Sequence, residues 1–212
     1  MKQSFRIAVF ASGSGTNFQA IADAIAAEKL DVSIELLVCD RPQAPVVERA
    51  KQAGVTTFAF EPKEYASREE YETEIVRLLM EYQIDLIVMA GYMRLITDQL
   101  LKPYEGRIIN VHPSLLPAFP GVNAIGKALD YGVKWTGVSV HFVDGGMDTG
   151  AIIAQQPIEI TDDDTEATLA RRVHLLEHQL YPQVISWIRE GKVKLNGRIV
   201  SLQDGVSFSE LW

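Results

Sequence analysis

The chain has 212 residues, enough for one domain with a buried core, and its 47% apolar and 23% charged residues are ordinary for a soluble globular protein. Its net charge of −8 argues against a nucleic-acid backbone as the partner, so an anionic substrate would need a local positive site. The single cysteine, Cys39, excludes a disulfide framework, and neither a signal peptide nor an apolar run of the ~20 residues that span a bilayer is present, so we expect a cytoplasmic protein.

Strands and helices are predicted to alternate along the first half of the chain. Short apolar runs predict strands at residues 7–11, 33–39, 56–60, 85–90 and 107–111. Apolar periodicity predicts helices between them, at residues 18–29, 42–53, 67–82 and near 97–101. This alternation indicates an α/β fold with a doubly wound, mostly parallel sheet that is flanked by helices.

The second half of the chain mixes strands, helices and loops, and we expect antiparallel pairing there. The predicted elements are a helix at 124–130, strands at 136–142 and 151–160, a long helix at 165–190 and a terminal hairpin at 192–200. Apolar and polar residues alternate in the strand at 136–142, which predicts that the strand is half-exposed. Pro182 falls inside the long helix and is expected to kink or divide it.

A glycine-rich turn at residues 12–17 (SGSGTN) connects the first predicted strand to the first helix. Glycines let backbone N–H groups approach a ligand closely, and a helix N-terminus adds unpaired donors and a partial positive charge. The turn lacks the lysine of a nucleoside triphosphate loop and the spacing of a dinucleotide fingerprint, so a monophosphate fits best. The alternative is a tight turn that ends in an ordinary helix cap.

Polar side chains end the predicted strand at 107–111. Asn110 and His112 precede a segment that contains three prolines, and in a parallel sheet this strand end opens onto the crevice where ligands bind. The amide can donate to an oxyanion, and the imidazole can carry a proton near neutral pH. Asp148, in the glycine-rich loop after the strand at 136–142, is the best candidate to orient the imidazole. Asp144 is its rival, and a purely structural His112 is the alternative.

Residues 109–121 (INVHPSLLPAFPG), together with the glycine-rich turn, resemble the folate-dependent formyltransferases, and the resemblance covers nearly the whole chain. It implies a Rossmann-like formyltransferase fold in a single domain, 1–212, with a phosphate-binding half at about 1–105 and a folate and catalytic half at about 106–212. The activity that it implies is direct transfer of a formyl group from 10-formyltetrahydrofolate, a co-substrate, to the amine of 5'-phosphoribosylglycinamide in purine biosynthesis.

The resemblance also implies roles for individual residues. Asn110 is the neutral oxyanion donor, His112 the proton shuttle and Asp148 the orienting base, with no metal involved. The residues expected to contact the phosphoribosyl substrate are Gly15, Thr16, Asn17, Arg68, Glu177 and His178. The residues expected to line the folate site are Met93, Arg94, Leu95, Ile96, Asp144, Gly145, Gly146 and Met147. Without the resemblance, Arg68 would be a solvated helix residue, and Met93 and Leu95 would be core residues.

Other functions stay open at this point. Relatives that hydrolyse formyltetrahydrofolate carry an additional N-terminal domain, and transfer-RNA formyltransferases carry a further basic C-terminal domain. A non-catalytic nucleotide-phosphate binding protein would use the glycine-rich turn alone. Residues 174–178 match H-x-x-E-H, an inverted zinc-peptidase pattern, although an amphipathic helix also explains them. We expect small-molecule substrates without nucleic acid or membrane, and leave open whether the protein is a homodimer.

Overall fold

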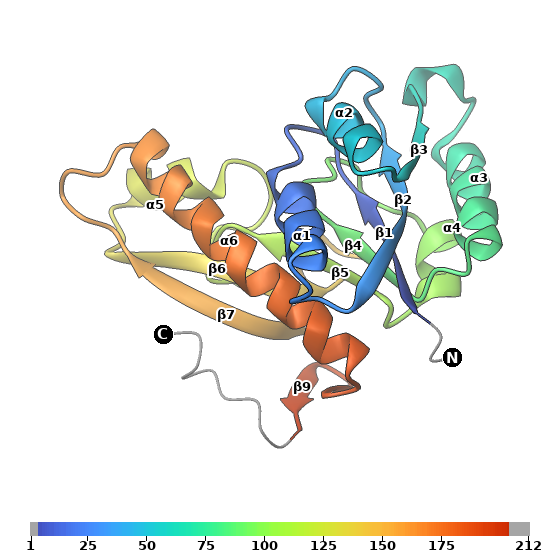
Figure 1. Ribbon diagram of the computed structural model, residues 1–212. Coiled ribbons are helices and arrows are strands. Elements are labelled where there is room, and N and C mark those ends of the chain that lie inside the picture. Colours follow the sequence, from blue (N-terminus) through green and yellow to red (C-terminus); the bar gives the residue numbers. More distant parts are fainter. Residues whose placement is uncertain (1–3, 204–212) are drawn as a thin grey trace. The chain divides into compact units, whose positions relative to one another are not determined.

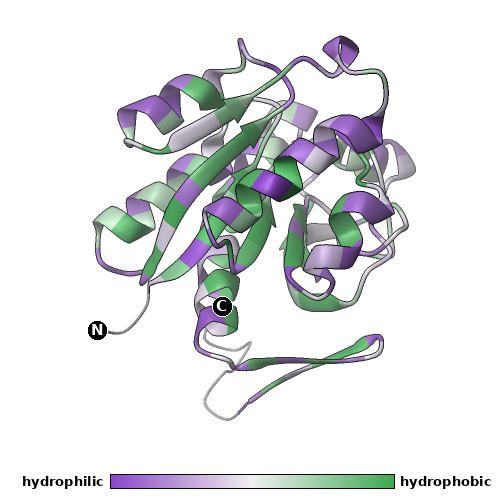
Figure 2. Cartoon of the chain, turned by 90° about the vertical axis from the view of Figure 1, so that its right-hand side faces the viewer, coloured by the Kyte–Doolittle hydropathy of each residue, from purple (hydrophilic) through white to green (hydrophobic). Residues whose placement is uncertain are grey.

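The computed structural model describes residues 4–203, and Figure 1 shows its helices and strands. The chain divides after Ile109 into two compact units. The strands of the first unit are β1 (Phe5–Phe10), β2 (Val32–Cys39), β3 (Thr56–Ala59) and β4 (Leu86–Met89). β1 pairs in parallel with both β2 and β4, and β2 pairs in parallel with β3. The apolar runs of β1, β2 and β4 supply buried side chains, and Figure 2 shows the hydrophobic colour concentrated on the strands.

The helices of the first unit are α1 (Thr16–Ala26), α2 (Pro45–Gln52), α3 (Arg68–Glu81) and α4 (Asp98–Leu101), with 3₁₀ turns η1 (Pro62–Glu64) and η2 (Lys102–Tyr104). The start of α3 is capped by Ser67, whose hydroxyl accepts from the backbone N–H of Glu70. The buried carboxylate of Glu72 accepts from the backbone N–H and the hydroxyl of Thr97, at the start of α4. These two bonds join α3 to α4.

The second unit continues from β5 (Ile108–His112) through α5 (Ala124–Tyr131), β6 (Trp135–Phe142), β7 (Ile152–Glu159) and α6 (Glu166–Arg189). A hairpin of β8 (Val193–Asn196) and β9 (Ile199–Leu202) follows. β6 and β7 pair antiparallel, and α6 packs on both of them and on α5 (Figure 1). The predicted antiparallel part and the terminal hairpin are therefore confirmed.

The strand order of the main sheet is β3-β2-β1-β4-β5-β6-β7. The predicted α/β fold with a mostly parallel sheet flanked by helices is confirmed. Among residues 4–203, no helix combines the length and the apolar character that crossing a membrane requires.

Two local predictions need correction. α6 runs without interruption from Glu166 to Arg189, so Pro182 does not divide it, although proline removes one backbone donor there. β6 is not half-exposed, because all of its residues after Trp135 are buried. Its polar face is covered by the proline-rich loop at 113–121: the hydroxyl of Ser139 donates to the carbonyl of Ser114 and accepts from the N–H of Leu116. Alternation in this strand reflects two different buried environments, not one buried and one solvated face.

Candidate active site

Asn110 and His112 lie on the same face of β5, because side chains two residues apart in a strand point the same way. The loop that follows is held on both sides. The hydroxyl of Ser114 donates to the carbonyl of Ala118 over 2.6 Å, and the side-chain amide of Gln155 donates to the carbonyl of Leu116 over 2.9 Å. The loop at 113–121 therefore presents its backbone to the end of β5 in a fixed geometry.

Asp148 lies in a tightly constrained loop after β6. Its backbone has φ of 55°, a left-handed conformation that few residues other than glycine adopt. The carboxylate of Asp144 accepts from the N–H of Gly146 and from the hydroxyl of Thr149, which ties the loop to itself. At Gly150, a Cβ atom would lie 1.7 Å from the carbonyl oxygen of Phe142, so only glycine fits. Asp144 thus shapes the loop, and Asp148 is the carboxylate that it presents.

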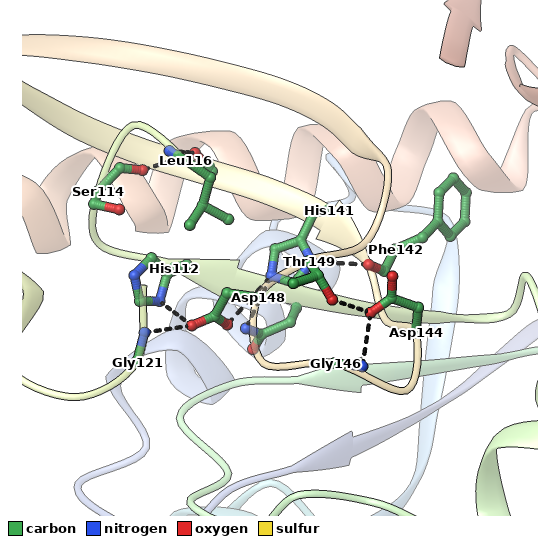
Figure 3. Close-up of polar contacts among 12 residues, drawn as sticks. His112, Ser114, Leu116, Gly121, His141, Phe142, Asp144, Gly146, Asp148 and Thr149 are labelled. Carbon is green, nitrogen blue, oxygen red and sulfur yellow. Dashed lines mark hydrogen bonds and ion pairs between the residues drawn. The ribbon is translucent and has the colours of Figure 1, made fainter. Parts of the chain in front are cut away.

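The carboxylate of Asp148 lies between two histidines (Figure 3). Its Oδ2 is 3.5 Å from Nδ1 of His112 and accepts from the N–H of Gly121 over 2.7 Å. Its Oδ1 is 3.6 Å from Nε2 of His141, which is itself 3.3 Å from the side-chain nitrogen of Asn110. The structure therefore brings Asn110, His112 and Asp148 together as predicted, and adds His141 as a fourth member.

Backbone carbonyls fix which nitrogen of each imidazole carries the constant proton. Nε2 of His112 donates to the carbonyl of Phe119 over 2.9 Å, and Nδ1 of His141 donates to the carbonyl of Phe142 over 2.8 Å. In both rings, the nitrogen that can gain or lose a proton is the one that faces Asp148. The carboxylate and the two imidazoles can therefore hold one mobile proton between them.

The pKa of Asp148 reflects these neighbours. Burial raises it, but the hydrogen bonds from His141 and from the N–H of Gly121, together with the charges of both imidazoles, outweigh burial and lower the pKa to about 2. Asp148 is thus ionised throughout the neutral range, as a group that stabilises an imidazolium must be.

The glycine-rich turn lies in the first unit and is shaped by α2. Gly15 has φ of 73°, and a Cβ atom there would lie 2.5 Å from the side chain of Val46. Val46 donates its N–H to the carbonyl of Gly13, and the guanidinium of Arg49 donates to the carbonyl of Ser14 over 2.8 Å. The first turn of α1 has no acidic residue and no side-chain cap, so its backbone N–H groups suit an anion.

The predicted folate segment, residues 93–96, is attached to this turn. The N–H of Met93 donates to the hydroxyl of the buried Ser12 over 2.8 Å, and the guanidinium of Arg94 pairs with the buried carboxylate of Asp40 at 2.9 Å. Met93 and Leu95 are 62% and 51% exposed, so the alternative that they are core residues is wrong. A backbone held firmly beneath exposed apolar side chains is what a flat heterocycle would need.

Comparison with known proteins identifies the family of the chain. Residues 5–185 match the formyl transferase family. The chain belongs to this family. A phosphoribosylglycinamide formyltransferase of Bacillus subtilis is 54% identical over 180 residues, which cover 85% of this chain and 92% of the relative. One from Escherichia coli is 37% identical over 90% of both chains. The crystal structure of glycinamide ribonucleotide transformylase 1 from Symbiobacterium toebii has a TM-score of 0.93 and 41% identity, and the match covers 96% of each chain. The predicted formyltransferase is confirmed.

His141 is the residue of this formyltransferase site that sequence reasoning missed, because it was assigned to the solvated face of a half-exposed strand. A signal was present in the sequence. The alternate positions of the strand are Gly137, Ser139 and His141, with no lysine, arginine, aspartate or glutamate among them. A solvated strand face usually carries such charges, whereas a buried polar face carries groups that can be satisfied by hydrogen bonds.

We expect His141→Ala to lower kcat about 10-fold, since a residue that orients a catalytic donor contributes less than the donor itself. Glutamine can place an acceptor near the position of Nε2, so His141→Gln is expected to recover most of the activity if His141 acts by orienting Asn110. Lys134→Ala, at an exposed lysine just before β6, is the matched control. Steady-state kinetics distinguishes these outcomes; equal losses for both His141 variants would instead assign the proton at Nε2 the main role.

The remaining predicted residues of the formyltransferase site lie on α3 and α6. Arg68 is the first residue of α3. Burial raises the pKa of Tyr71, and the charges of Arg68 and Arg94 offset part of this rise. Glu177 is buried on α6. Burial lowers the pKa of His178, whose Nε2 is enclosed and has no hydrogen-bond partner within the described residues.

The H-x-x-E-H motif on α6 forms a different arrangement from the one that zinc requires. Nδ1 of His174 is 3.1 Å from the carboxylate of Glu177, and this hydrogen bond raises the pKa of His174. Across residues 4–203, no three side chains of His, Cys, Asp or Glu are grouped so as to hold a metal ion. The zinc alternative therefore lacks a third ligand in this part of the chain.

Proposed function

We propose that this protein transfers a formyl group from 10-formyltetrahydrofolate to the amine of 5'-phosphoribosylglycinamide, a step of purine biosynthesis. The observation that carries the proposal is the ionised carboxylate of Asp148 held between His112 and His141, with the amide of Asn110 beside them. The family and the names of the relatives from Bacillus subtilis and Escherichia coli support the donor and the acceptor.

The arrangement suits direct transfer. The amine nitrogen attacks the formyl carbon, a C–N bond forms, and the carbonyl electron pair moves to oxygen. The side-chain nitrogen of Asn110 has two N–H groups: Nε2 of a neutral His141 can accept from one, and the other can donate to the oxyanion. When His141 is protonated, its Nε2 donates to Asp148 instead. The hydroxyls of Ser114 and Ser139 donate to backbone carbonyls, and that of Thr149 donates to Asp144, so none of the three is prepared as a nucleophile.

Proton transfer completes the step. The attacking amine must lose a proton. The oxyanion then re-forms the carbonyl, the bond between the formyl carbon and the folate nitrogen breaks with its electron pair going to the nitrogen, and that nitrogen must gain a proton. Nε2 of His112 is engaged by the carbonyl of Phe119, and its Nδ1 faces the carboxylate of Asp148. Because a carboxylate with a pKa of about 2 is a weak base, we assign the proton uptake to Nδ1 of His112 or Nε2 of His141, with ionised Asp148 stabilising the imidazolium that forms.

Substrate binding is proposed at the residues predicted from the sequence. The phosphate binds at Gly15, Thr16 and Asn17, where the first turn of α1 and the cation of Arg49 favour an anion. The folate contacts residues 93–96 and 144–147, with 10-formyltetrahydrofolate as co-substrate. Arg68, Glu177 and His178 complete the ribonucleotide contacts.

The test is the loss of 10-formyltetrahydrofolate, followed by absorbance, with and without the ribonucleotide and with a chelator control. We expect loss only when the ribonucleotide is present and no effect of the chelator. Loss without the ribonucleotide would identify a hydrolase with water as the acceptor. No loss in either arm would leave a binding protein, and sensitivity to the chelator would revive the zinc alternative.

A further inference from the structure

The hairpin of β8 and β9 lies outside the family match, which ends at residue 185. Its strands pair from Val193 with Leu202 to Asn196 with Ile199, which leaves Gly197 and Arg198 as a two-residue turn at the tip. Gly197 has φ of 60°, as such tight turns require. β9 contacts β7, so the hairpin is attached to the sheet of the second unit.

The tip of this hairpin contacts the loop at residues 144–150, which carries Asp148 and is called the catalytic loop below. The Nη1 of Arg198 donates to the backbone carbonyl of Thr149 over 2.8 Å. Thr149 directly follows Asp148, and its hydroxyl donates to Asp144 over 2.6 Å. The charged guanidinium makes this a stronger bond than one between two neutral groups. The hydroxyl of Thr149 is therefore held by its own loop, and its carbonyl is held by the hairpin.

The contact matters because the backbone of Asp148 needs external support. A left-handed φ of 55° is unfavourable for an aspartate unless the surrounding structure enforces it. The N–H of Gly121 holds the carboxylate of Asp148, and Arg198 holds the carbonyl of Thr149, the next residue. Asp148 is therefore held both at its side chain and in the backbone that follows it. Without Arg198, the peptide between Thr149 and Gly150 could rotate and turn Oδ1 and Oδ2 away from the imidazoles.

We infer that Arg198 is a positioning residue for Asp148, and that the terminal hairpin is part of the catalytic unit although it lies beyond the family match. This inference rests on the proposed function, since it assigns Asp148 a part in formyl transfer. It concerns the orientation of the carboxylate and not the binding of either substrate.

The test compares Arg198→Ala, Arg198→Lys and the control Lys194→Ala, which removes an exposed cation from the same hairpin. We expect Arg198→Ala to lower kcat about 10- to 100-fold with little change in either KM, because a small misplacement of a catalytic group has effects of this size. Arg198→Lys should recover most of the loss, and Lys194→Ala should match the wild type. Amide hydrogen exchange of the peptide at 144–150, measured without substrates, should accelerate only in Arg198→Ala.

The outcomes separate this inference from the proposed function. Wild-type kcat and unchanged exchange in Arg198→Ala would overturn the inference and leave the function standing. Equal losses in Arg198→Ala and Lys194→Ala would also overturn it, because they would reflect damage to the hairpin as a whole. A wild-type protein without ribonucleotide-dependent transfer would overturn the function, while the exchange data would still report whether Arg198 holds the loop.

Discussion

Replacing Asp148 with asparagine is expected to lower kcat about 1,000-fold, since general acid–base groups contribute about 10²- to 10⁴-fold. Asparagine has the same shape and tolerates a left-handed backbone, so the loop should keep its conformation. The substituted amide carries no negative charge, so it cannot stabilise the imidazolium that forms when His112 or His141 takes up a proton. Single-turnover and steady-state assays at saturating substrates would measure the effect.

Acid unfolding provides the internal check on the Asp148→Asn variant. The folded-state pKa of about 2 is below the ordinary value, so ionised Asp148 contributes stability above the unfolded pKa that is lost as the pH falls through about 2. A shift of this size corresponds to about 2 kcal/mol at neutral pH. The difference in unfolding free energy between wild type and variant should therefore shrink below about pH 4. Asp130→Asn, at an exposed position on α5, is the matched control, and turnover by Asp148→Asn close to wild type would contradict the mechanism.

His112→Ala is expected to produce the second large effect, a fall in kcat of about 100- to 1,000-fold with modest changes in KM. The variant removes the imidazole nitrogen that faces Oδ2 of Asp148 and leaves a cavity beside the carbonyl of Phe119. Added imidazole should enter this cavity and restore part of the activity. The restored rate should depend on the pKa of the imidazole derivative if proton transfer limits the reaction.

Leu116→Ala controls for the loss of packing near His112. Leu116 is buried in the neighbouring loop, and its backbone, which the substitution keeps, makes the contacts with Ser139 and Gln155. We expect this variant to unfold more readily by about 2–5 kcal/mol while it keeps more activity than His112→Ala. Near-full turnover by His112→Ala, or no rescue of its activity by any imidazole, would remove His112 from the proton path.

The elements whose pattern depends on local residues were predictable from the sequence. The apolar runs of β1 and β4 and the capping residues before α3 specify their structures through contacts close in the chain. Asn110 and His112 were predictable for the same reason, because two residues on one face of a strand must lie together. Asp148 was predictable as a residue of the loop, but its bond to Gly121 joins positions 27 residues apart, and no local pattern encodes that contact.

The contributions of His141 and Arg198 depend on packing between distant segments. β6 becomes buried on both faces only because the loop at 113–121 folds over it, so periodicity alone suggested solvent where there is protein. Arg198 reaches the catalytic loop across 49 positions of sequence. Residue type alone predicted that Met93 and Leu95 are core residues, because apolar residues are usually buried, whereas the structure exposes both of them.

The left-handed backbone at Asp148 sets a limit on how this enzyme can be made more robust. Such a conformation costs of the order of 1 kcal/mol, and glycine would adopt it without strain. Glycine at position 148 would relieve this strain, but it would also remove the ionised carboxylate, which contributes about 2 kcal/mol at neutral pH and to which we assign the stabilisation of the imidazolium. Substitution at this one position therefore removes the strain without a net gain in stability, so a stabilised form of the enzyme has to gain its free energy elsewhere in the chain.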